Sequence, residues 1–269
     1  EFVQDRYQSN FLASGLDRDN LSLAVIAEVG PQSRPVALSL RQDHNEQYGS
    51  HTTGQASIGQ NTDAGFFWAS YGTAFKAPNF FDLYGYGGDA SLQPEESSTG
   101  EIGWKLDNPN WQTSASLFRI RTDNLIEFDN SQQQIFNIGN VRIDGLELAA
   151  SRAMGSLNLG LQLDLLDHKN LDTGQALIRR PERKTRLHLS QSLGQFGWKL
   201  SAQHNSDAAD FNNQPLPAWT RLDASGSWQP HDSLALKLEL SNLLDEQYET
   251  VASYNQPGRE IRLGIDYRF

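Results

Sequence analysis

The residue types that most often carry out catalysis are present in this sequence, but they are not spaced for it. There is no G-x-S-x-G, H-E-x-x-H or phosphate-loop pattern, and "GYGGD" at 85–89 follows no βαβ unit. The six histidines are scattered, and only His44 and His51 share a loop, without the spacing of metal ligands. The acidic stretch "DHKNLD" lacks the spacing of a calcium loop. We therefore predict no catalytic residue, no metal site and no cofactor.

Arginines are the first candidates for ligand binding. Arg179 and Arg180 stand in "RRP", where a loop becomes a patterned segment. The guanidinium fork can donate hydrogen bonds to an amide or a phosphate of a ligand. The competing interpretation is an ion pair with a carboxylate of a neighbouring segment, such as Asp164 or Glu239. The sequence leaves both interpretations of Arg179 open.

Aromatic residues of the loops are the second candidates. Phe211 and Tyr254 offer rigid flat faces, and Tyr254 adds a polar tip. Such residues also pack on neighbouring loops or lie in an interfacial girdle of a membrane protein. A third group, in the loop around 79–86, can either contact a ligand or simply fold that loop; its members are Asn79, Phe80, Phe81, Tyr84 and Tyr86.

The elements that must position these residues are β-strands. In "EIRLGIDYRF" at 260–269 every second residue is apolar, which is typical of a strand with one apolar face. The same pattern predicts thirteen strands, near 20–29, 34–43, 50–60, 64–74, 96–107, 110–121, 139–152, 156–166, 184–194, 196–205, 219–229, 233–243 and 258–269.

The connections between these strands alternate between short and long. "AMGS", "LGQ" and "QPHDS" are tight and rich in turn formers, whereas "NSDAADFNNQPLPA" and "LDEQYETVASYNQP" are long. Loops that are long on one side only are typical of an outer-membrane barrel with short periplasmic turns. A soluble β-sandwich does not sort its loops in this way. We predict an all-β, antiparallel, up-and-down transmembrane β-barrel.

Composition agrees with this class and excludes others. The formal net charge of −11 argues against a nucleic-acid partner, because phosphate neutralisation needs clustered Lys and Arg. No apolar run approaches the roughly 20 residues of a transmembrane helix, but barrel strands are apolar only at alternate positions. No cysteine is present, which argues against a disulfide scaffold.

Strand counting gives an expectation about completeness. If the last strand ends in the periplasm, residues 1–19 form an extracellular loop segment and residues 20–269 form the barrel part. Thirteen is odd, so the first and last strands would run parallel and an antiparallel sheet could not close. Open edges leave backbone groups unpaired in lipid at several kcal/mol each. We therefore expect further strands to precede this sequence.

Several stretches carry a family resemblance. "YGTAFKAPNFFDLYG" (71–85), "LQPEESSTGEIGWK" (92–105), "FNIGNVRIDGLELA" (136–149), "RRPERKTRLHLS" (179–190), "NLLDEQYETV" (242–251) and the closing "PGREIRLGIDYRF" occur in family order. Together they resemble the TonB-dependent outer-membrane receptors. Within that family, "YGTAFKAPN" and "YETVASYNQPGRE" are most similar to the vitamin B12 (cobalamin) receptors. Siderophore receptors share most of these sequence motifs.

The resemblance implies a barrel of about 22 strands around an N-terminal plug, of which this sequence would hold the last thirteen, with plug and TonB box absent. It implies location in the Gram-negative outer membrane, among lipid and lipopolysaccharide, and a TonB complex that acts through the missing N-terminal part. Arg179 falls at a ligand-contacting position of the family, with Phe211 and Tyr254 as aromatic neighbours of cobalamin or a siderophore. Tyr267 and the terminal Phe269 resemble the signal read by the barrel-assembly machinery; Phe269 can equally sit in an interfacial girdle.

The sequence is compatible with three functions to different degrees. An energised transporter of cobalamin, or of a ferric siderophore, follows from the resemblance. A passive porin would need a constriction lined by opposed charges and no plug. A barrel enzyme would need converging acid, base or Ser/His groups at adjacent inward positions, which the sequence does not provide.

Overall fold

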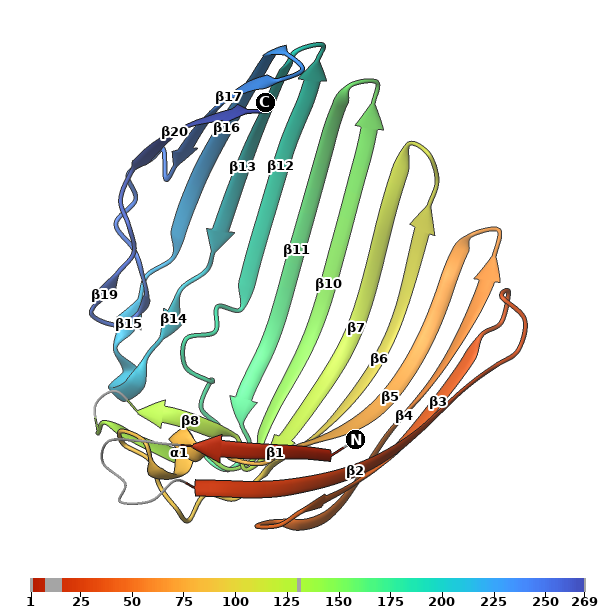
Figure 1. Ribbon diagram of the computed structural model, residues 1–269, viewed down its shortest axis with the longest axis vertical. Helices are drawn as coiled ribbons and strands as arrows, with labels where there is room; N and C mark the ends of the chain where they lie inside the picture. The colour runs from red at the N-terminus through yellow and green to blue at the C-terminus, as the bar shows by residue number, and fades with distance from the viewer. Residues whose placement is uncertain (1, 8–15, 130–131, 269) are drawn as a thin grey trace. The chain divides into compact units, whose positions relative to one another are not determined.

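A computed structural model of the chain describes residues 2–7, 16–129 and 132–268. Nearly all regular structure in these residues is β-strand (Figure 1). One short α-helix, α1 (Phe80–Tyr84), and one 3-10 turn, η1 (Phe211–Asn213), occur in loops. Among the described residues, no helix has the length and apolar character needed to span a membrane.

Fourteen strands form a single sheet whose spatial order follows the chain order, β1-β2-β3-β4-β5-β6-β7-β10-β11-β12-β13-β16-β17-β20. This is the predicted up-and-down topology, and neighbouring strands pair antiparallel. The strand bounds are β1 (Phe2–Tyr7), β2 (Leu16–Val29), β3 (Val36–Asn45), β4 (Gly49–Thr62), β5 (Gly65–Lys76), β6 (Glu95–Asp107), β7 (Trp111–Asp123), β10 (Val141–Met154), β11 (Leu157–Asn170), β12 (Arg183–Leu193), β13 (Phe196–Asn205), β16 (Trp219–His231), β17 (Leu234–Ser241) and β20 (Glu260–Tyr267).

Strand pairing keeps the apolar face continuous. Across β17 and β20, Leu238 lies opposite Leu263, while Glu239 lies opposite Arg262 on the other face. Leu263 is 82% exposed and Ile265 is 73% exposed. A contiguous apolar surface left open by its own chain is unusual for a soluble domain and is expected where lipid covers the strands.

We expected residues 1–19 to form a loop. This expectation is wrong for residues 2–7 and 16–19, which form strands. β1 occupies residues 2–7 and pairs with β2, which begins at Leu16 instead of residue 20. In the sequence "FVQDRY" the two aliphatic or aromatic residues at the start are adjacent, so the stretch lacks the apolar–polar alternation that identifies the other strands. With fourteen strands in the sheet, the parity argument from an odd number no longer holds. The extracellular placement of this segment stays a prediction.

The chain divides into two compact units. Unit 1 holds residues 1–103, 117–144 and 168–176, and unit 2 holds residues 104–116, 145–167 and 177–269. The strands β8 (Ile126–Asp129) and β9 (Gln134–Asn137) form a hairpin in a long connection of unit 1. The corresponding small pairs of unit 2 are β14 (Ala208–Ala209) with β15 (Pro215–Leu216), and β18 (Glu249–Val251) with β19 (Tyr254–Asn255).

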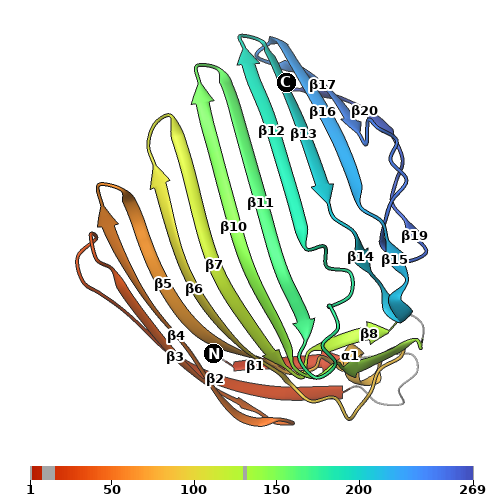
Figure 2. The same ribbon diagram turned by 180° about the vertical axis from the view of Figure 1, so that it is seen from behind.

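The long loops of unit 1 have an apolar core of their own. Phe80, Leu83, Leu92 and Ile135 are buried against one another, and Phe128 of β8 packs against them. Figure 2 shows the backbone of α1 and β8 in this region. Asn79 starts α1 with a capping box, because its side chain accepts the N–H of Asp82 and the Asp82 carboxylate accepts the N–H of Asn79. Asn79 and Phe80 thus stabilise the fold of this loop, Asn79 by capping α1 and Phe80 by packing in the apolar core. In the same loop Phe81, Tyr84 and Tyr86 are exposed.

Candidate functional site

The predicted binding residues lie in three long loops of unit 2, which follow β11, β13 and β17. Small strands in these loops, β14, β15 and β19, lie at the same end of the unit 2 strands (Figure 1). Asp210, only 3% exposed, joins the three loops. Its Oδ1 accepts the N–H of Phe211 and the Nε–H of Arg179, both at 2.8 Å. Its Oδ2 accepts the N–H of Ala252 at 2.8 Å. One buried carboxylate thus fastens residues from all three loops, and we call this set the Asp210 cluster.

Arg179 is held by its backbone as well as by its charge. Its φ is 57°, a left-handed conformation that is uncommon for a residue with a Cβ. Its N–H donates to the Ala209 carbonyl at 2.7 Å, and its guanidinium carbon lies 5.2 Å from the centre of the Phe211 ring. The expected alternative, an ion pair, is therefore formed, but its partner is Asp210. Of the two partners that the sequence suggested, Asp164 instead accepts from Arg186 at 3.3 Å.

One donor of Arg179 remains available. Its Nη2 is shielded from solvent and has no hydrogen-bond partner among the residues that the structure describes. A shielded N–H group without an acceptor is costly, and an acceptor brought by a ligand would remove that cost. The ion pair and a ligand contact are therefore compatible, because they use different nitrogens of one guanidinium.

The two aromatic candidates differ in their surroundings. Phe211 is partly buried in η1 beneath the Arg179 guanidinium. Tyr254 is 64% exposed in β19, two residues beyond Ala252, whose N–H binds Asp210. The structure therefore brings Arg179 and Phe211 into contact, and it joins Tyr254 to them through the backbone of the third loop.

A second buried residue, Asn242, anchors that third loop and was not predicted. It is 1% exposed; its side chain donates to the carbonyls of Glu246 and Pro257 and accepts the N–H of Glu246. Its own N–H donates to Asp223 on β16 at 2.9 Å. The signal in the sequence was the "NLLDE" stretch, which the resemblance marked without giving a physical role for the asparagine.

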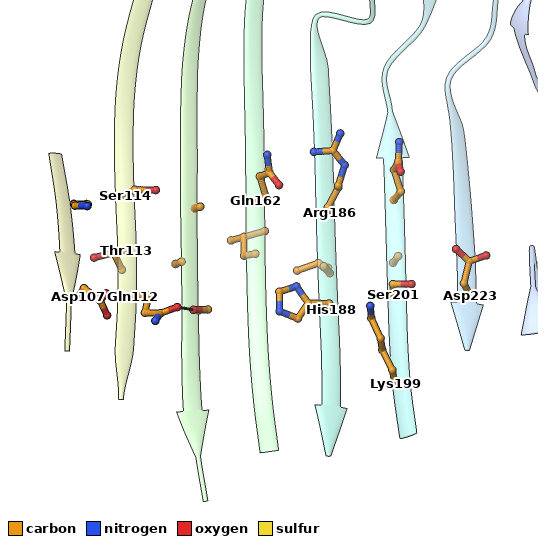
Figure 3. A pocket seen from close by; sticks show the side chains of 18 of the residues that line it. Asp107, Gln112, Thr113, Ser114, Gln162, Arg186, His188, Lys199, Ser201 and Asp223 are labelled. Carbon is orange, nitrogen blue, oxygen red and sulfur yellow. Dashed lines mark hydrogen bonds between the residues drawn. The ribbon is translucent and has the colours of Figure 1, made fainter. Parts of the chain in front are cut away.

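Below the loops, the polar face of unit 2 is hollowed by a cavity of about 650 Å³. Figure 3 shows Gln162, Arg186, His188, Lys199 and Asp223 on this face, from β11, β12, β13 and β16. Gly160 leaves room for the imidazole of His188, because a Cβ there would lie 1.8 Å from His188 Cε1. Among the residues that line this cavity, arginine, lysine and histidine outnumber aspartate and glutamate. The cavity surface therefore suits polar or anionic ligands.

The acidity of Asp210 gives a prediction about pH. Burial alone would raise the pKa of Asp210, but the N–H groups of Ala252 and Phe211 and the Arg179 guanidinium hold that pKa below its usual value. A lowered folded-state pKa stabilises the cluster above the unfolded value of about 3.9, and this contribution is lost as pH falls through the folded value. We expect protection of the Ala252 N–H against hydrogen exchange, corrected for intrinsic rates, to be constant from about pH 7 to about pH 4 and to fall below. Unchanged protection down to about pH 2 would contradict the assignment.

The other predicted positions have plainer surroundings. Tyr267 ends β20 and is 57% exposed, and Phe269 lies outside the described residues. His44 contacts Ser50, whereas His51 contacts the Tyr48 carbonyl and Glu96. Among the residues that the structure describes, no group of His, Cys, Asp and Glu is arranged to hold a metal ion.

Comparison with known proteins gives a consistent result. Residues 5–243 match the model of the family described as "TonB dependent receptor-like, beta-barrel". Among solved structures, the siderophore receptor PirA from Acinetobacter baumannii has a TM-score of 0.83 at 18% identity, over 100% of this chain and 51% of its own. The ferric enterobactin receptor PfeA from Pseudomonas aeruginosa scores 0.81 at 18% identity, over 96% and 46% of the two chains. The copper transporter OprC scores 0.80 at 16% identity, over 93% and 48%. The chain spans about half the length of these proteins, and the likeness concerns the fold.

Proposed function

Because this chain belongs to the TonB-dependent receptor-like β-barrel family of the outer membrane, we propose that it forms barrel strands and external loops of an active transporter. Its ligand is a corrinoid, cobalamin, and a TonB complex supplies the energy through a segment outside this chain. The single observation that carries this proposal is the Asp210 cluster, which fixes a cation and aromatic faces within three long loops of one unit.

The chemistry of the cluster suits a large planar ligand with polar edges. Phe211 and Tyr254 supply flat faces for ring packing, and Arg179 supplies a donor for an amide or phosphate group. Since Asp210 neutralises the guanidinium, the site does not require a ligand of high negative charge. The resemblance of "YETVASYNQPGRE" to the cobalamin receptors covers the loop that carries Ala252 and Tyr254.

A ferric siderophore is the second candidate ligand. It is favoured by the likeness to PirA and PfeA, whose names state siderophore and ferric enterobactin reception. A passive porin is the third candidate and needs no energy source. No enzymatic activity is proposed, since the matching family is described as receptor-like and the similar solved structures are named as receptors or a transporter.

Uptake of radiolabelled cobalamin by cells with and without a functional TonB system tests the transporter proposal. We expect accumulation against a gradient that stops when TonB is absent. Equal entry in both strains would support a porin. TonB-dependent accumulation of a ferric siderophore without cobalamin would keep the transporter class and replace the ligand.

The C-terminal residue gives a prediction about assembly. The apolar face of β20 continues into Tyr267, and Phe269 follows at the same parity. If this end is read by the barrel-assembly machinery, deleting Phe269 should lower the outer-membrane abundance of the protein several-fold, as judged by surface labelling. Deleting an exposed residue of a short turn, such as Asp232, is the control. Unchanged abundance without Phe269 would leave that residue only a place in the aromatic girdle.

A further inference from the structure

A second binding feature of unit 2 lies on its apolar face, next to the short turns. The guanidinium carbon of Arg152 lies 4.7 Å from the centre of the Trp111 ring, in the geometry of a cation–π contact. Trp111 begins β7 and Arg152 stands near the end of β10. We propose that this pair binds the phosphate of an anionic phospholipid headgroup in the membrane leaflet at the short-turn end of the strands.

The position of the pair follows from strand alternation. On β10, Leu146 and Leu148 share the strand parity of Arg152, and Leu148 is exposed, whereas Ala149 and Ser151 have the opposite parity. On β7, Trp111 has the strand parity of Leu117, and both side chains are exposed. Arg152 therefore ends an apolar row of the lipid-facing surface. An arginine at such a place extends its charge to the headgroup region while its stem stays against apolar surface.

The turn between β6 and β7 builds the position of the tryptophan. The Asn108 side chain accepts the N–H groups of Asn110 and Trp111 at 3.1 and 2.9 Å, which fixes the first residue of β7. The Asn110 carbonyl then accepts the N–H of Ala153 at 3.0 Å, directly after Arg152. These backbone contacts hold the ring and the cation side by side before any lipid arrives.

The charge of Arg152 indicates the kind of partner. Several other arginines of unit 2 have a carboxylate at ion-pair distance, including Arg186 with Asp164 and Arg221 with Asp223. In the part of the chain that the structure describes, Arg152 has no carboxylate within ion-pair distance, and it is exposed. A planar guanidinium that is stacked on an aromatic ring still presents its N–H fork, and phosphate oxygens match that fork in pairs. In barrels the short turns face the periplasm, so the leaflet is the periplasmic one and a phospholipid is the occupant.

Native mass spectrometry of the protein extracted from outer membranes in mild detergent tests the site. Short-chain phosphatidylglycerol and phosphatidylcholine are titrated against the wild type, Arg152→Gln and Arg34→Gln. Arg34 is the matched control, since it is exposed in the short turn between β2 and β3 and contacts Gln60 instead of an aromatic ring. We expect Arg152→Gln to weaken phosphatidylglycerol binding about tenfold, as expected for the loss of a charge-assisted pair of hydrogen bonds, and Arg34→Gln to leave it unchanged.

Arg152→Lys keeps the charge and the stem and serves as a second variant if the glutamine variant yields little folded protein. It should bind phosphatidylglycerol more weakly than the wild type and still more strongly than phosphatidylcholine. Phosphatidylglycerol binding that is unchanged in both Arg152 variants, or lowered equally by Arg34→Gln, would overturn the proposal. So would equal binding of the two lipids by the wild type.

Discussion

Replacing Asp210 with alanine will release the three loops of unit 2 from one another. The substitution leaves the N–H groups of Phe211 and Ala252 without their acceptor and the Arg179 guanidinium without its counter-charge. A buried group that loses its partner costs about 1–3 kcal/mol, and breaking a fully buried ion pair costs about 3–5 kcal/mol. Since the Arg179 side chain is 23% exposed, the ion pair is not fully buried, and we expect a total cost of about 3 kcal/mol.

Hydrogen exchange of the Ala252 amide is the measurement for this change. We expect Asp210→Ala to accelerate that exchange by about a hundredfold, which corresponds to about 2.8 kcal/mol of local opening free energy. Asp207→Ala is the matched control, because Asp207 belongs to the same loop and is exposed. Equal exchange rates in the two variants would show that the carboxylate does not hold the loops.

Replacing Arg179 with alanine has the second large effect, on ligand affinity. The variant removes the Nη2 donor that has no partner among the described residues, the cation over Phe211 and the counter-charge of Asp210. We expect ligand binding to weaken by about 1–3 kcal/mol, or about 5- to 150-fold. Arg183→Ala is the control, since Arg183 is exposed at the start of β12 and carries the same charge.

A double-mutant cycle separates the two roles of Arg179. If the residue acts only by fixing Asp210, Asp210→Asn and the double variant will bind ligand as weakly as Arg179→Ala. If Nη2 also contacts the ligand, Arg179→Ala will bind more weakly than Asp210→Asn. Ligand affinity that is unchanged by Arg179→Ala would restrict this residue to folding the loops.

Most strands of the sheet were predictable because the different environments of their two faces determine the sequence pattern. Lipid on one face and a polar interior on the other impose a period of two, and segments such as 260–267 show it without interruption. β1 was missed because its sequence does not alternate apolar and polar residues; the structure identifies it by its pairing with β2. The connection between β3 and β4, residues 46–48, is short although it lies on the side of the long loops, so loop length alone does not assign the side.

The candidate site was predictable only in part. The types of Arg179, Phe211 and Tyr254 indicated binding, but the partner of Arg179 could not be read from spacing, because Asp210 lies 31 residues away on another loop. Asp210 itself stands among polar loop residues with no pattern to distinguish it. Its role depends on the left-handed backbone at Arg179 and on the turn at Ala252, which are properties of the folded loops.

We propose that the three loops joined by Asp210 form one side of a pocket for a corrinoid. Equilibrium binding of cyanocobalamin and of a ferric siderophore to the detergent-extracted protein, with Asp210→Ala and Asp207→Ala beside the wild type, tests it most directly. We expect the wild type and Asp207→Ala to bind cyanocobalamin and not the siderophore, and Asp210→Ala to lose this binding. Siderophore binding without cobalamin binding, or cobalamin binding that Asp210→Ala leaves unchanged, would contradict the proposal.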